Sequence, residues 1–387
     1  MTALAPLGVY VHWPYCARIC PYCDFNVFKA RGRDTEAARL ADAILADLAG
    51  QAAITGPRRL VSIFFGGGTP SLMDPVWVAA IIAKARALWS PADDLEVSLE
   101  ANPTDAEADR FEALAQAGVS RLSLGLQSLD DAALKFLGRN HDAAEGLRAA
   151  ATARRAFGRV SLDAIYARPG QSAAAWREEL VRIVDLGAEH ISPYQLTLET
   201  GTAFDRAVRR GAWAPLDQDA ATELYETTQA VLSAAGYEAY EVSNHARGPA
   251  AQSRHNLVYW RGYDYVGVGP GAHGRITGPK GRLASEAVHR PAGYIAAVAA
   301  RCVGFVDPET LTAEAAAEER LLSGLRILDG VPFDELAALN LRPESRVVRR
   351  LVGLELVADD PARLRATPAG RRVLDRLTAD LVLERPT

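Results

Sequence analysis

Residues 10–23 read Tyr-Val-His-Trp-Pro-Tyr-Cys-Ala-Arg-Ile-Cys-Pro-Tyr-Cys and hold three of the four cysteines of the chain. Cys16, Cys20 and Cys23 form a C-x3-C-x2-C group, whereas Cys302 stands alone. Prolines inside the stretch prevent a regular helix, so a loop can bring the three thiols toward one centre. A tight cysteine group in a reducing compartment indicates a metal centre rather than disulfides.

Two kinds of metal centre fit three cysteines. A structural zinc ion requires four protein ligands in a closed tetrahedron, and His12 or His141 is a candidate for the fourth. A [4Fe–4S] cluster held by three cysteines leaves one iron open to a substrate or cofactor. We favour the cluster because structural zinc ligands usually come as two spaced pairs, and no second pair is present. Zinc and buried, unliganded thiols stay open as alternatives.

The composition is that of an ordinary globular protein. The 387 residues are 49% hydrophobic and 24% charged, which excludes disordered and fibrous classes. The net charge of -5 gives no general attraction to nucleic acid or to an anionic membrane. We see no apolar run of membrane-spanning length and no leader-like segment. These features predict a cytoplasmic protein with one large domain and a smaller appendage.

Short apolar runs alternate with helical stretches through the first 200 residues. The six runs with strand character are Leu7–His12, Leu60–Phe65, Leu95–Glu100, Val119–Leu126, Val160–Tyr166 and His190–Leu198. The helical stretches between them are Glu36–Ala53, Pro75–Trp89, Asp105–Ala117, Ala143–Phe157 and Ala173–Leu186. Such alternation predicts a parallel sheet with right-handed crossovers. Six units predict an α/β fold built on an open, partial (β/α)6 barrel.

Polar residues and glycines follow the strands of this predicted barrel, where the chemistry of such folds lies. The first strand leads into the cysteines, and the next four lead into Gly66–Pro70, Glu100–Pro103, Gln127–Ser128 and Pro169–Gln171. A turn or a helix cap would explain any one of these features. The same feature after five successive strands favours a shared site.

The cysteine group and the Gly66–Pro70 run together resemble the radical S-adenosylmethionine (SAM) superfamily. The resemblance covers roughly the first 200 residues. It implies that Cys16, Cys20 and Cys23 bind a [4Fe–4S] cluster whose open iron chelates SAM. One electron from the reduced cluster would then cleave SAM to methionine and a 5′-deoxyadenosyl radical.

The resemblance also implies a set of SAM contacts. Glu100 and the glycines would meet the amino group of SAM, and Arg139 its carboxylate. Gln127 and Asp163 would hold the ribose, and Tyr22 would lie near the adenine. For Arg139 and Asp163, a surface ion pair is the alternative interpretation. The full set predicted to contact SAM is Tyr10, Tyr22, Gly66, Gly67, Gly68, Thr69, Glu100, Gln127, Arg139 and Asp163.

Within the superfamily, the chain resembles the coproporphyrinogen-dehydrogenase-like group. The resemblance rests on Tyr10–Cys16, Leu137–His141 and Ile165–Gln171. This group contains oxygen-independent dehydrogenases, which decarboxylate coproporphyrinogen III, and heme chaperones, which deliver heme to other proteins. One departure is Ala167-Arg168, where the group leads us to expect glycine and an apolar residue.

Three features favour the chaperone type. Phe25 stands where the dehydrogenases carry a further cysteine, and few residues precede Cys16. The run His255–Trp260 matches the H-N-x-x-Y-W motif associated with heme in the chaperones. The resemblance therefore implies a carrier that passes heme to acceptor hemoproteins, respiratory ones among them, without necessarily using SAM cleavage. Decarboxylation of coproporphyrinogen III is the alternative, and whether the chain is an enzyme stays open.

The motif His255–Trp260 has two interpretations. Neutral imidazole is a common axial ligand of heme iron, and the rings of Tyr259 and Trp260 offer flat apolar surface to a porphyrin. Alternatively, His255 satisfies buried polar groups while the two aromatic residues pack in the core. Tyr10 and His273 are further candidate contacts to heme.

The remaining chain suggests a division into three parts. We predict a radical SAM barrel over 1–205, an extension or cover over 206–306 that contains His255–Trp260, and a small winged-helix-like domain over 307–387. Mixed charges on the last part favour packing or partner docking over nucleic-acid binding. A homodimer is left open.

Overall fold

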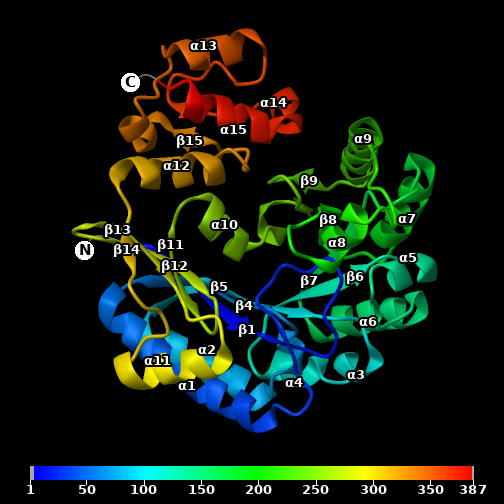
Figure 1. Ribbon diagram of the computed structural model, residues 1–387, viewed down its shortest axis with the longest axis vertical. Coiled ribbons are helices and arrows are strands. Elements are labelled where there is room, and N and C mark those ends of the chain that lie inside the picture. The colour runs from blue at the N-terminus through cyan, green and yellow to red at the C-terminus, as the bar shows by residue number, and fades with distance from the viewer. Residues whose placement is uncertain (1–3, 386–387) are drawn as a thin grey trace.

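Six parallel strands in sequence order form the centre of the structure, a computed structural model that describes residues 4–385 (Figure 1). The strands are β1 (Pro6–Trp13), β4 (Arg59–Gly67), β5 (Ser90–Ala101), β6 (Arg121–Gln127), β7 (Arg159–Tyr166) and β8 (His190–Gln195). Each pairs in parallel with the next. The sheet stays open, so the predicted partial (β/α)6 barrel is confirmed.

Helices return the chain between these strands. They are α1 (Asp34–Thr55), α2 (Pro75–Leu88), α3 (Asp105–Ala108), α4 (Phe111–Gln116), α5 (Asp131–Phe136), α6 (Ala143–Ala156) and α7 (Ala173–Asp185). Side-chain caps start several of them; the Asp142 carboxylate, for example, accepts from the backbone of Glu145 in a capping box. The predicted helix over 105–117 is split into α3 and α4, and the short α5 was not predicted.

The segment predicted as an extension or cover lengthens the sheet at both edges. On one side, β11 (Asp264–Val268) pairs in parallel with β1, followed by antiparallel β12 (His273–Gly278), β13 (Gly281–Glu286) and β14 (Glu309–Thr310). On the other side, β10 (His245–Ala246) and β9 (Glu238–Ala239) add to β8. Two helices, α8 (Ala203–Arg209) and α9 (Gln218–Ala234), precede these edge strands.

Buried polar contacts from α1 fix the added edge. Asp47 accepts a hydrogen bond of 2.6 Å from the hydroxyl of Tyr294 on α11 (Pro291–Arg301). One turn later, the Gln51 amide donates to the carbonyl of Gly267 in β11 at 2.7 Å. Because both side chains are buried, these bonds tie β11 and α11 to the barrel.

A second hydrophobic core lies in the C-terminal part, shown in orange and red above the sheet in Figure 1. Its elements are α12 (Ala313–Gly324), β15 (Val331–Pro332), η3 (Phe333–Leu339), α13 (Arg346–Gly353), β16 (Arg363–Leu364), α14 (Pro368–Arg372) and α15 (Leu374–Leu383). The helices around the small β15–β16 pair agree with a winged-helix-like unit. The boundaries 1–205, 206–306 and 307–387 stay a prediction, and their outermost residues lie outside the described part.

The departure at Ala167-Arg168 has a physical explanation. Ala167 has φ of 60°, a left-handed conformation that glycine adopts more readily than any other residue. Arg168 turns inward and forms a buried ion pair with Glu179, and it also donates to the hydroxyl of Ser128 at 2.5 Å. The loop therefore keeps a backbone shape suited to glycine while its arginine is neutralised inside the fold.

Asp47→Asn is expected to remove one pH dependence of stability. Burial raises the pKa of Asp47 from its ordinary 3.8 to about 6. Between these values the folded chain retains a proton that the unfolded chain releases, so this group makes stability fall as pH rises. The full change in the free energy of unfolding is about 3 kcal/mol, because one pKa unit corresponds to about 1.36 kcal/mol. Urea unfolding from pH 4 to 7.5 should therefore show the stability of wild type falling relative to that of the variant as pH rises; a constant offset would contradict this.

Candidate functional site

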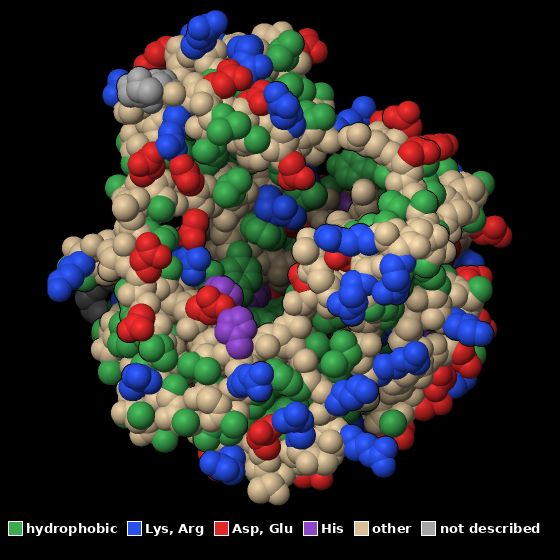
Figure 2. All heavy atoms as spheres, in the orientation of Figure 1, with side chains coloured by type: hydrophobic (Ala, Val, Ile, Leu, Met, Phe, Trp, Pro, Cys, Tyr) green, Lys and Arg blue, Asp and Glu red, His purple; other side chains and the backbone are tan. Residues whose placement is uncertain are grey.

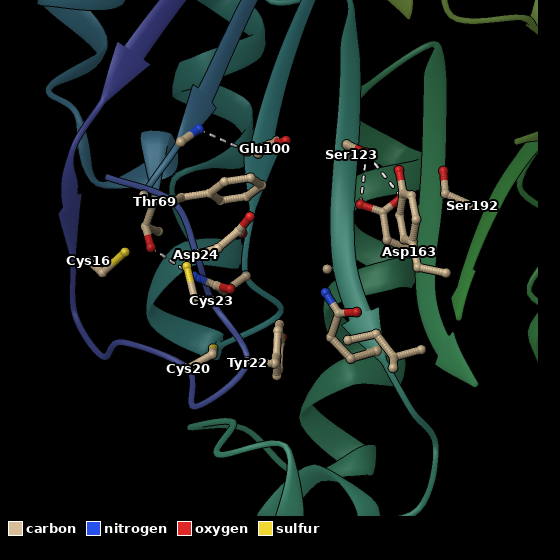
Figure 3. A pocket seen from close by; sticks show the side chains of 18 of the residues that line it. Cys16, Cys20, Tyr22, Cys23, Asp24, Thr69, Glu100, Ser123, Asp163 and Ser192 are labelled. Atoms are coloured by element: carbon tan, nitrogen blue, oxygen red, sulfur yellow. Dashed lines mark hydrogen bonds between the residues drawn. The ribbon is translucent and has the colours of Figure 1, made fainter. Parts of the chain in front are cut away.

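The carboxyl ends of the six central strands surround a pocket of about 610 Å³. Figure 3 shows side chains from the cysteine loop (residues 14–27) on one side of it and from β6, β7 and β8 on the other. Of the predicted site residues, those that line the pocket are Cys16, Cys20, Tyr22, Cys23, Gly67, Gly68, Thr69, Glu100, Gln127, Arg139 and Asp163. The fold thus brings together residues that are far apart in the sequence.

The three cysteines stand around the pocket rather than at one point. Burial raises the pKa of the Cys16 thiol to about 12 and that of Cys23 to about 11. Within residues 4–385, no group of three or more His, Cys, Asp or Glu side chains is close enough to hold a single metal ion. A cubane binds each cysteine through a different iron, so its thiolates stand apart around a cluster. Three thiols around one pocket, one of them buried and two partly exposed, with no histidine among the lining residues, therefore fit a [4Fe–4S] cluster.

The two histidines considered as a fourth zinc ligand are engaged elsewhere. His12 contacts the Tyr10 hydroxyl at 3.0 Å and the Asn26 carbonyl at 2.9 Å through its two ring nitrogens. His141 Nε2 lies 3.2 Å from the carbonyl of Leu126. Neither ring lines the cysteine pocket.

The glycine run packs against the cysteine loop. Gly68 N–H donates to the carbonyl of Trp13 at 2.7 Å, and Thr69 N–H to that of Tyr15 at 2.9 Å. A Cβ on Gly68 would lie 2.7 Å from the oxygen of Tyr15, so no side chain fits. Gly67 has φ of 104° and donates to Glu100 at 3.2 Å. The lack of a side chain at Gly68 is required for its close contact with the cysteine loop. This contact leaves the backbone of the glycines facing the pocket.

Two partly buried carboxylates face the pocket, and neither forms an ion pair with any residue from 4 to 385. Burial and the nearby Asp163 raise the pKa of Glu100 to about 8. Burial also raises the pKa of Asp163, although hydroxyls of Ser123 and Ser161 donate to it at 2.9 and 3.1 Å. Because unpaired buried carboxylates disfavour their charged form, a cationic ligand group would be bound strongly between them. SAM carries such groups in its ammonium and sulfonium.

Arg139 links the cysteine loop to the strand ends. Its guanidinium donates to Cys20 Sγ at 3.3 Å, to Asn102 Oδ1 at 2.5 Å and to the carbonyl of Gly125 at 3.1 Å. Tyr22 is also within hydrogen-bonding distance of it at 3.4 Å. The surface ion pair considered for Arg139 is therefore not what the structure contains. A fixed, buried guanidinium at the rim suits a carboxylate ligand.

Gln127 ends β6 in an unusual conformation. Its φ is 64°, and the pairing of β6 with β7 shifts register just before it. A left-handed non-glycine residue is strained, and such strain often marks a binding site. Here the irregularity places the amide at the pocket, as predicted for a ligand contact.

Several lining residues were not predicted from the sequence. The largest group comes from β6, where Arg121, Ser123 and Gly125 line the pocket together with the predicted Gln127. These are alternate residues of one strand, so they share a face of the sheet. Polar residues at every second position of an otherwise apolar strand would have identified them. Asn102, Ser192, Tyr194, Asn244 and Asn256 also line the pocket.

Two predicted SAM contacts lie behind the pocket wall. The ring of Tyr10 is buried and approaches a Cβ built on Gly66 to 3.0 Å. Neither residue is among those that line the pocket. The structure therefore does not bring Tyr10 or Gly66 to the site in the way that the resemblance implied.

The predicted heme residues are packed inside the protein. His255 is 1% exposed, and its ring nitrogens are hydrogen-bonded to the hydroxyls of Ser62 and Tyr259, each at 2.9 Å. Burial lowers the pKa of His255 to about 3. His255 and Tyr259 belong to α10 (Arg254–Trp260), and Ser62 contacts this helix through His255. Ligation of heme iron by His255 does not agree with this conformation, because both nitrogens already have partners; the alternative interpretation as a core residue does.

Trp260 joins the two cores instead of offering a free surface. The guanidinium of Arg326 lies 4.6 Å from the centre of its ring, and Arg320 donates to its carbonyl at 3.1 Å. Both arginines belong to the C-terminal part of the chain. From the same helix, only Asn256 lines the pocket.

Family comparisons agree with these features. Residues 10–186 match the radical SAM superfamily, and residues 311–373 match the HemN C-terminal domain. The chain is 40% identical to the mouse mitochondrial radical S-adenosyl methionine domain-containing protein 1, over 97% of this chain and 87% of that protein. It is 39% identical to the heme chaperone HemW of Escherichia coli, over 76% of this chain and 77% of the relative.

A solved structure shows the same fold. The coproporphyrinogen III oxidase HemN of Escherichia coli, described as a radical SAM enzyme, superposes with a TM-score of 0.81. The match covers 98% of this chain and 91% of that one, at 20% sequence identity. At this identity the similarity establishes the architecture and not the reaction.

Replacing any one cysteine of the loop should remove the cluster. In Cys16→Ser, Cys20→Ser or Cys23→Ser, we expect iron and sulfide after anaerobic reconstitution to fall by about tenfold or more, since even an outer partner is worth about 10–100-fold in metal affinity. Cys302→Ser is the matched control, because Cys302 is exposed and outside the pocket. Zinc without sulfide in the wild type, or equal loss in the control, would contradict the assignment.

Proposed function

The chain belongs to the radical SAM superfamily and, within it, to the family of HemW and its relatives, and from this premise we propose that it is a heme chaperone. It binds heme and transfers it to acceptor hemoproteins. The observation that supports this most is its kinship, over three quarters of its length, to a protein named as a heme chaperone.

Family membership implies a [4Fe–4S] cluster and SAM, and we assign both to the strand-end pocket. When bound, they supply one-electron chemistry at the SAM sulfonium. Cys16, Cys20 and Cys23 hold the cluster as thiolates. The pocket has a volume of about 610 Å³, which suits a small-molecule ligand such as SAM.

The side chains of the pocket each have a distinct role toward SAM in this proposal. Glu100 and Asp163 attract the cationic groups, and Arg139 holds the carboxylate. Gln127 orients the polar sugar from its strained position at the end of β6. Tyr22, which packs against Phe204 at 6.2 Å between ring centres, forms an aromatic wall.

Decarboxylation of coproporphyrinogen III is the second candidate. The shared architecture with HemN favours it, but that similarity is one of fold. Phe25 lines the pocket at the position where the dehydrogenase pattern has a cysteine. The pocket volume also leaves little room for a tetrapyrrole beside SAM. We therefore place heme outside this pocket.

The partners follow from the proposed transfer. Acceptor hemoproteins, including respiratory ones, are the expected recipients, and nucleic acid is not an expected partner. Among residues 4–385, no helix is both long enough and apolar enough to cross a membrane. The cytoplasmic location stays a prediction, because one relative is named as mitochondrial. A homodimer is likewise untested.

Glu100→Gln should weaken SAM binding. A hydrogen bond to a charged partner is worth about 1.5–3 kcal/mol, so we expect an affinity at least about tenfold lower by anaerobic titration calorimetry. Because burial disfavours the charged form of Glu100, the variant should melt no lower than wild type. Glu112→Gln, at an exposed carboxylate of α4, is the control. Unchanged SAM affinity in Glu100→Gln would remove this residue from the site.

Heme transfer and decarboxylation can be separated directly. The reconstituted protein loaded with heme should transfer it to an apo-hemoprotein, seen as a shift of the Soret band and as recovered acceptor activity. The same protein with SAM, reductant and coproporphyrinogen III should give no protoporphyrinogen beyond background. Catalytic formation of protoporphyrinogen would contradict the chaperone proposal and establish the enzyme.

A further inference from the structure

Only two of the seven histidines present an exposed imidazole. The side chains of His273 and His289 are 57% and 62% exposed. The other five are buried: His12, His141, His190, His245 and His255. Figure 2 shows purple side chains beside a carboxylate at the rim of the central hollow of the molecule. These two imidazoles are therefore the ones that a heme iron can reach from solvent.

The pair is positioned by the added edge of the sheet. His273 on β12 lies opposite Glu286 on β13 in the antiparallel register, and His289 follows three residues later. Glu286 Oε1 lies 2.5 Å from His289 Nε2 and 3.8 Å from His273 Nε2. A carboxylate beside an imidazole orients the ring and makes it a stronger ligand. Iron would use the second ring nitrogen, or replace the carboxylate contact.

A basic pocket lies beside α11, the helix that begins two residues after His289. It measures about 550 Å³ and its lining includes Arg31, Arg33 and Arg39, with Ala292 and Ile295 of α11 as apolar wall. Arg33 is paired with Glu36 at 2.6 Å, whereas Arg31 and Arg39 form no ion pair with any residue from 4 to 385. Since α11 begins two residues after His289, the arginines and the imidazoles share one end of this helix. Guanidinium groups are suited to carboxylates such as heme propionates.

The cysteine loop contacts the same place. The amide of Asn26 donates to the carbonyl of His289 at 2.7 Å and to that of Pro270 at 3.0 Å. The preceding residue, Phe25, is 59% exposed and lines the cluster pocket. An exposed apolar ring therefore stands one residue before the Asn26 contact to His289 and offers a flat surface for a porphyrin.

We propose that heme binds on the outer face of the protein, with its iron on His273 or His289 and its propionates toward Arg31 and Arg39. This inference rests on the proposed function. It explains how a carrier can release its cargo: an acceptor protein can reach a ligand on the surface, whereas a heme held by His255 would require the core to open. Within this proposal, Glu286 is a positioning residue that acts through the two imidazoles.

Heme titration of the anaerobically reconstituted protein tests the site. In His273→Ala/His289→Ala we expect at least about tenfold weaker binding and loss of the imidazole-type Soret band, whereas either single variant should retain part of both. Iron and sulfide content and melting temperature should not change, since both side chains are exposed. A double variant with wild-type affinity and spectrum would overturn the proposal while leaving the chaperone function intact. A wild type that binds no heme would overturn both.

The propionate contact has its own test. Arg31→Glu/Arg39→Glu should weaken binding of heme but not of heme dimethyl ester, which lacks the two negative charges. Arg177→Glu/Arg182→Glu, on exposed positions of α7, is the matched control for the change in charge. Equal weakening for heme and ester, or an equal effect of the control, would remove the basic pocket from the site.

Discussion

The close approach of two backbones, Gly68 against the cysteine loop, determines the rest of the site. The hydrogen bonds from Gly68 and Thr69 to the carbonyls of Trp13 and Tyr15 join the end of β4 to the chain that follows β1. A Cβ at Gly68 would meet main-chain atoms, which cannot move aside as a flexible side chain can. This contact fixes where the three thiols lie relative to the pocket. It would therefore also determine the position of a bound cluster.

Only the parts of the fold that leave a local pattern could be predicted from the sequence. The six central strands are local units, each an apolar run followed by a helix, so periodicity identified them. The pairing of β11 with β1 joins residues more than 250 positions apart and leaves no local pattern. The buried hydrogen bonds of Asp47 and Gln51 that hold this edge could not be predicted either. Two polar residues one turn apart on a helix usually lie on its exposed face.

The candidate site divides in the same way. Residues at strand ends were found because all parallel strands end at one edge, and Cys16, Glu100 and Gln127 do meet there. Residues whose role depends on packing were misplaced. Tyr10 and His255 carry suitable chemistry, but the first lies behind Gly66 and the second bonds Ser62 and Tyr259. Residue type states what a side chain can do, whereas its neighbours decide whether it is accessible.

Charge balance connects the pocket to the ligand that it suits. Glu100 and Asp163 sit in a wall that also contains Arg121, yet neither forms an ion pair with it within the described residues. Leaving two carboxylates unpaired in a buried place destabilises the empty protein, because each loses hydration without gaining a partner. A ligand that brings positive charge favours the deprotonated form of these carboxyls, so binding is expected to lower the pKa of Glu100 from about 8. The pocket therefore suits a cation, whereas the tetrapyrrole, whose side groups are anionic, is better matched by Arg31 and Arg39 of the basic pocket beside α11.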